Sequence, residues 1–93
     1  MNIKGMLIGV RRFSFSDKDS GELVKGAKLA IGMAPDNDQA AGYVLNELPA
    51  LYEDYPSFAK ACNELAGQQV VVECDVQLKG RYTKLRAVKI SAA

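Results

Sequence analysis

The sequence contains no histidine, no tryptophan and only two cysteines, Cys62 and Cys74. Without histidine the chain lacks the side chain that titrates closest to neutral pH, so acid–base catalysis would depend on shifted carboxylates or lysines. A structural zinc site needs four ligands, usually cysteine or histidine, and two cysteines are too few. We therefore expect no enzyme activity, no catalytic residue, no metal site and no cofactor.

Long apolar runs are also absent. A membrane-spanning helix needs about 20 apolar residues, and no stretch of the chain approaches that length. The first apolar residues reach Arg11 and Arg12 too early for a signal peptide. We expect no membrane contact and a cytoplasmic location, in which Cys62 and Cys74 remain reduced and largely buried.

The composition that is present fits one globular domain covering residues 1–93, with 48% hydrophobic and 25% charged residues. The net charge is only +1, but its distribution is uneven. Residues 1–33 and 57–93 each hold six basic and three acidic side chains, whereas residues 34–56 hold five acidic and no basic ones. If the two ends of the chain share a sheet, that sheet has a positive face. The alternative is a set of solvated surface charges without a partner.

Alternation of apolar and other side chains predicts four strands, over residues 2–15, 23–33, 68–79 and 83–91. Turns rich in Asp, Ser and Gly join them in pairs, at 17–22 and at 79–82. Within the first strand, Gly5 and Gly9 indicate a bulge or a sharp bend. Strict alternation places Phe13 and Phe15 on the same face as Ile3 and Leu7, which leaves core packing and an exposed role both open.

An apolar stripe at helical spacing predicts a helix over residues 57–66, formed by Phe58, Ala61, Cys62 and Leu65. Gly67 is placed to end this helix. The segment before it is ambiguous, because its apolar spacing also suits a helix whereas Pro49 opposes one. We interpret it as a short third strand over residues 42–47.

The predicted order is three strands, a helix and two strands, which is the order of the OB-fold. We therefore expect a mainly β chain, a five-stranded antiparallel OB-like barrel with one short helix between strands 3 and 4. Ligands of this fold bind on the face of strands 2 and 3 and on the neighbouring loops.

The chain resembles the small single-stranded DNA-binding proteins of filamentous phages and similar mobile elements. The resemblance is carried by residues 10–15, by the hairpin at 17–28 and by the closing hairpin at 70–90, together about half of the chain. It implies an OB-type barrel that forms homodimers and coats single-stranded DNA. The function that follows is sequence-independent binding that protects replication or transfer intermediates.

Such binding needs cations that follow the phosphates and flat side chains that stack on bases. The candidate residues from the two hairpins are Arg11, Arg12, Phe13, Phe15, Lys18, Lys25, Lys28, Lys79, Arg81, Tyr82 and Lys84. The partner is single-stranded DNA, with RNA left open, as are base preference and oligomeric state. The alternative function is a β-barrel accessory subunit that docks on a basic protein through the acidic and aromatic segment 34–56.

Overall fold

The computed structural model describes residues 1–35 and 37–93, with every side chain among them except those of Lys79 and Tyr82. The strands are β1 (Asn2–Ser16), β2 (Leu23–Met33), β3 (Val44–Ala50), β4 (Gln69–Lys79) and β5 (Tyr82–Ala92). A 3-10 turn, η1 (Tyr52–Asp54), leads into the helix α1 (Tyr55–Leu65) between β3 and β4. None of the helices in this described part has the length and apolarity that crossing a membrane requires.

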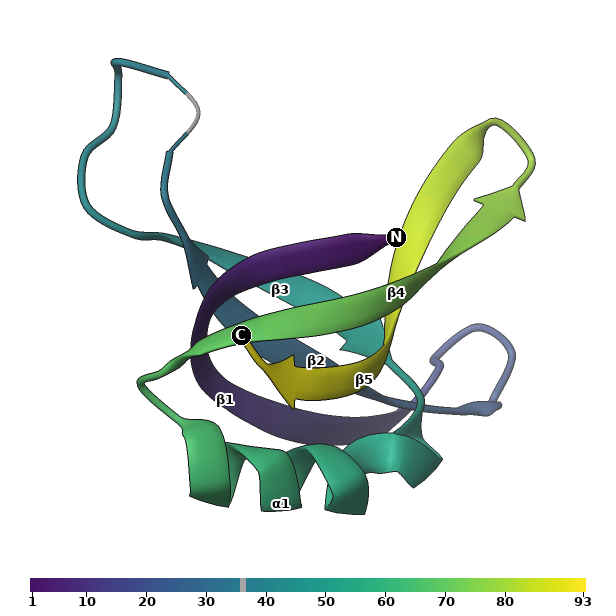
Figure 1. Ribbon diagram of the computed structural model, residues 1–93. Coiled ribbons are helices and arrows are strands. Elements are labelled where there is room, and N and C mark those ends of the chain that lie inside the picture. Colours follow the sequence, from purple (N-terminus) through teal and green to yellow (C-terminus); the bar gives the residue numbers. More distant parts are fainter. Residues whose placement is uncertain (36) are drawn as a thin grey trace.

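The five strands form one antiparallel sheet in the order β3-β2-β1-β4-β5. Figure 1 shows this sheet curling strongly, with α1 lying beneath β1. The expected mainly β class, with a single α-helix between strands 3 and 4, is confirmed. The five antiparallel strands of the expected OB-like barrel are also present, but no strand ladder joins β3 to β5 among the described residues. The sheet is therefore barrel-like but open.

The core lies inside the curl of the sheet. Its largest fully buried side chains come from three strands and are Leu7, Leu29, Ile31, Val70 and Val72. Phe58 on α1 is 2% exposed and covers one end of this group, as the predicted helical stripe requires. Burial of each such side chain stabilises the fold by about 1.5–3 kcal/mol, so this cluster sets the curvature of the strands around it.

A β-bulge in β1 changes which side chains face the core. Leu7 pairs with Ile31 and Gly9 pairs with Ala30, which leaves Ile8 without a partner on β2. One extra residue shifts the alternation by one position, so every later side chain of β1 faces the opposite side. The placement of Phe13 and Phe15 on the face of Leu7 was therefore wrong.

A second bulge lies opposite β4, where Glu73 pairs with Lys89 but Cys74 pairs with Ala87. Val88 is left as the extra residue and is exposed. Unbroken alternation along β5 would place Ile90 on the face opposite Ala87, but because of the bulge Ile90 packs against the same core cluster that contains Ala87.

The third strand exists, but it runs from Val44 to Ala50 rather than over residues 42–47. It includes Pro49, which the sequence analysis counted only as an argument against a helix. Proline is tolerated in β3 because β3 is an edge strand of the sheet, where one missing N–H donor need not break a ladder. The helix begins two residues before its predicted start, with Pro56 in its first turn, and Gly67 follows it with a φ of 84°.

Both cysteines are free thiols. Cys74 is buried in the core, and Cys62 on α1 is half-buried. Burial raises the pKa of each thiol, because the thiolate loses hydration; the nearby amino terminus opposes this shift at Cys74 and Asp75 adds to it. Raised thiol pKa values keep both groups in the unreactive neutral form.

Candidate nucleic-acid interface

The outer face of the sheet begins directly after the bulge in β1. Arg11, Phe13 and Phe15 of β1 lie opposite Lys28, Gly26 and Val24 of β2, and cross-strand partners share one side of a sheet. We call this side of β1, β2 and β3 the outer face. The opposite side of the same strands carries the buried core residues.

An aromatic pair occupies one end of the outer face. The ring centroids of Phe13 and Phe15 lie 6.1 Å apart with planes inclined by 22°. The Phe13 ring lies across Gly26, so closely that a Cβ at that position would stand 2.9 Å from the ring's Cζ. Phe15 is 55% exposed. The rings therefore pack on each other and on bare backbone, and they offer an apolar surface to solvent.

Two cations and one carboxylate meet beside this pair. The Arg11 Nε lies 3.6 Å from one carboxylate oxygen of Glu47, and the Lys28 Nζ lies 3.8 Å from the other. All three side chains are more than a third exposed. Surface ion pairs contribute only about 0–1 kcal/mol, and each cation keeps further N–H donors, so both can bind a phosphate beside the carboxylate.

Three adjoining depressions connect these groups into one groove. The first, of about 540 Å³, is lined by Arg11, Phe13, Phe15, Val24 and Lys28. A shallow one of about 150 Å³ follows, lined by Gly9, Val10, Arg11, Lys28, Ala30 and Glu47. The third, of about 460 Å³, reaches β5 and is lined by Lys28, Glu47, Leu48, Pro49, Lys84 and Leu85. The groove thus runs from the aromatic pair across β1, β2 and β3 to Lys84.

Arg12 and Lys25 do not join this groove. Alternation directs them to the other side of β1 and β2, where tyrosine rings meet them. The Arg12 guanidinium lies 4.9 Å from the Tyr55 ring centre and 5.9 Å from that of Tyr52, and the Lys25 Nζ lies 5.0 Å from Tyr52. Such cation–π contacts fix the β1–β2 hairpin against η1 and α1.

The remaining predicted residues lie in or near the turns. Lys18 is exposed in the β1–β2 turn and Arg81 is exposed in the β4–β5 turn, both of which project on the right of Figure 1. Lys84 lines the groove. The side chains of Lys79 and Tyr82 lie outside the described residues, although their backbones pair at the end of the β4–β5 ladder.

No protein-family model matches this chain, and no curated protein matches it. Function is therefore inferred from the residues of the site. In the part of the chain that the structure describes, no three Cys, Asp or Glu side chains come together as metal ligands.

The acidic segment 34–56 is divided among three places. Asp38 lies in the β2–β3 loop, Glu47 lies in the groove, and Glu53 and Asp54 lie in η1. Asp36 lies outside the described residues. The segment thus contributes one carboxylate to the groove, a contribution that sequence reasoning missed. Only the three-dimensional pairing of β3 with β2 brings Glu47 to Lys28.

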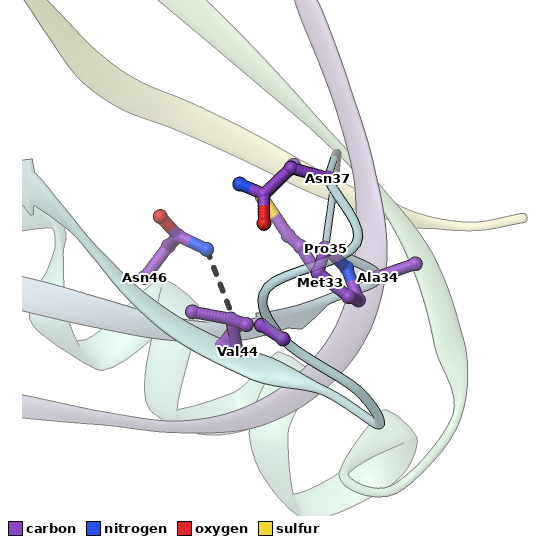
Figure 2. A pocket seen from close by; sticks show the side chains of 7 residues that line it. Met33, Ala34, Pro35, Asn37, Val44 and Asn46 are labelled. Atoms are coloured by element: carbon purple, nitrogen blue, oxygen red, sulfur yellow. Dashed lines mark hydrogen bonds between the residues drawn. The ribbon is translucent and has the colours of Figure 1, made fainter.

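A separate depression of about 330 Å³ lies under the β2–β3 loop and is shown in Figure 2. Its lining includes Met33, Pro35, Val44 and Asn46, and the Asn46 side-chain amide donates a hydrogen bond of 3.2 Å to the Val44 carbonyl. None of the described residues that line it is charged. It therefore lacks the cations that a phosphate chain requires and is not part of the groove.

Proposed function

We propose that this protein binds single-stranded DNA, with little sequence preference, along the groove of the outer face. The observation that carries the proposal is the exposed Phe13–Phe15 pair beside Arg11 and Lys28 on an open sheet face. In the cell, such binding protects replication or transfer intermediates. The resemblance to phage proteins supports the same function and adds a homodimer to the proposal.

The chemistry follows from the two kinds of side chain in the groove. Bases of a single strand stack on the phenylalanine rings, and each stacked base contributes about 1–3 kcal/mol whatever its identity. Arg11, Lys28 and Lys84 neutralise phosphates and release counterions, which makes affinity depend on salt. Arg11 can also place its planar guanidinium on a base.

Duplex DNA is a poorer ligand for this face. Its bases are already stacked on each other, so the phenylalanine rings gain no contact with a base face unless the duplex opens. Opening the duplex costs free energy, whereas a single strand exposes its bases without that cost. We therefore expect single strands to bind more tightly than duplex of the same length.

The test measures fluorescence anisotropy of a labelled oligonucleotide at about 50 and 200 mM salt, the range in which phosphate contacts change affinity most. Phe15→Ala is expected to weaken binding by about 1–3 kcal/mol with an unchanged salt slope, because a stacking contact carries no charge. Lys84→Ala is expected to lower the slope by about 0.7, the value of one phosphate contact on a single strand.

Lys60→Ala is the matched control, because Lys60 is equally a lysine but is exposed on α1, away from the groove. Its loss should leave the slope near that of the unmodified protein. If the unmodified protein fails to bind at the lower salt, the proposal is wrong. The accessory-subunit function, with segment 34–56 as its contact, then takes its place.

A further inference from the structure

The middle of the groove contains a shallow recess whose floor is made by two small residues. Gly9 of β1 pairs with Ala30 of β2, directly after the bulge residue Ile8. Arg11, Lys28 and Glu47 stand around this floor and bound a volume of about 150 Å³. A recess of this size has room for one flat nucleobase and none for a folded domain.

Gly9 leaves open space on the outer face. Its φ is not in the left-handed region, and a Cβ built on it would have no neighbour within 4 Å. In contrast, a Cβ on Gly5 would strike Ile31 and one on Gly26 would strike Phe13. A glycine inside a strand is typical of a bulge or of a place where a ligand approaches the backbone, and Gly9 lies beside the bulge with its bare backbone open to solvent.

The rim of the recess carries the chemistry that reads a base edge. Glu47 offers carboxylate oxygens, which accept a hydrogen bond from the exocyclic amino group of cytosine. Arg11 and Lys28 hold that carboxylate, at 3.6 and 3.8 Å, and Glu47 is the cross-strand partner of Ala30 in the floor. Thymine has a carbonyl where cytosine has the amino group, and a carbonyl oxygen cannot donate to Glu47.

We propose that this recess binds one nucleobase of the bound strand and that Glu47 makes it favour cytosine over thymine. The inference rests on the proposed function, since it names a position within the same groove. The preference is local: the phenylalanine pair accepts any base, and only the position over Gly9 discriminates.

Gly9→Val tests the recess. Valine suits a strand and its Cβ would meet no neighbour within 4 Å, so the fold should persist while the recess is filled, as circular dichroism and urea unfolding will show. We expect about tenfold weaker binding of an oligo(dC), the loss of one base contact, with an unchanged salt slope. The matched control is Ser91→Val, also a small-to-valine change on an exposed strand position, at the far end of β5.

Glu47→Ala tests the readout, because glutamine would still offer a carbonyl oxygen. The unmodified protein should bind oligo(dC) about fivefold more tightly than oligo(dT), and the ratio should fall to about one in the variant. Glu64→Ala on α1 removes the same charge outside the groove and should keep the ratio.

Three results would overturn the inference. The first is equal binding of oligo(dC) and oligo(dT) to the unmodified protein, and the second is undiminished binding of oligo(dC) by Gly9→Val. Either result leaves the proposed function intact but rules out the base-binding recess. The third is that Glu47→Ala binds both oligonucleotides more tightly with an unchanged ratio of affinities, which would mean that Glu47 only repels the phosphates. Failure of every oligonucleotide to bind is a different result, which removes the proposed function itself.

Discussion

At the scale of single residues, the outer face depends on the absence of a side chain at position 26. Gly26 is buried beneath the Phe13 ring, and that contact holds Phe13 flat enough to pack with Phe15. The aromatic pair is therefore positioned by backbone rather than by other side chains. A small change below the ring should alter the surface that a ligand meets above it.

Gly26→Ala is expected to destabilise the protein by about 1–3 kcal/mol, because its Cβ would stand 2.9 Å from the Phe13 ring and force it to tilt. Urea unfolding measures this loss, and anisotropy should show weaker binding of single-stranded DNA. In a Phe13→Leu background the same substitution should cost clearly less, since the flat ring is gone. Equal costs in both backgrounds would show that the ring does not rest on Gly26.

At the scale of elements, the bulge in β1 decides which half of the strand faces the core. Before it, Leu7 is buried; after it, Arg11, Phe13 and Phe15 face outward. Alternation read from the sequence cannot locate this shift, because Met6, Leu7, Ile8 and Val10 make both faces apolar and hide the change of phase. Gly9 did indicate a bulge or bend here, but not its effect on the later side chains.

Insertion of one alanine between Val10 and Arg11 should shift the alternation by one position and turn Arg11, Phe13 and Phe15 toward the core. Burying an arginine without a partner is among the most costly changes a small domain can undergo, so we expect the protein to lose about 3 kcal/mol or more of stability. Urea unfolding followed by circular dichroism measures this. Deletion of Ile8 should cost much less, because Leu7 stays opposite Ile31, Gly9 stays opposite Ala30 and Ile8 is 47% exposed. An insertion variant as stable as the deletion variant would contradict the assigned role of the register.

Whether the other elements could be predicted from the sequence depends in the same way on whether local or tertiary interactions determine them. Local patterning and turn chemistry determine some elements, which could therefore be predicted: the strand 23–33, the apolar helical stripe that includes Phe58, and the turns that contain Gly21 and Gly80. The end of β3 could not, since tolerance of Pro49 depends on β3 being an edge strand. Neither could the contacts of Arg12 with the rings of Tyr52 and Tyr55, which come from a distant part of the chain.

At the scale of the whole molecule, the open sheet leaves β3 and β5 each with one unpaired edge. β1 and β2 have neighbours on both sides, and β4 lies between β1 and β5. A net charge of +1 likewise conceals an outer groove that, among the described residues, holds three cations and one carboxylate. Both properties follow from where the strands lie rather than from composition.

Amide hydrogen exchange should reveal the open edge. We expect the slowest exchange in the centre of β1, β2 and β4, around Leu7, Leu29 and Val72, which are fully buried. The amides of β3 and β5 that point away from the sheet should exchange faster by orders of magnitude, because no ladder protects them. Equally slow exchange along both edges would indicate a closed barrel. Exchange followed by nuclear magnetic resonance distinguishes the two.

The bulge at Ile8 has an evolutionary consequence. Residues 2–6 of β1 pair with β4, close to the buried core. Residues 11–16 pair only with β2 and include the outer-face side chains of Arg11, Phe13 and Phe15. Selection can therefore act on the two halves of one strand separately. Mutations in the second half can explore new ligands while the first half preserves the folded state.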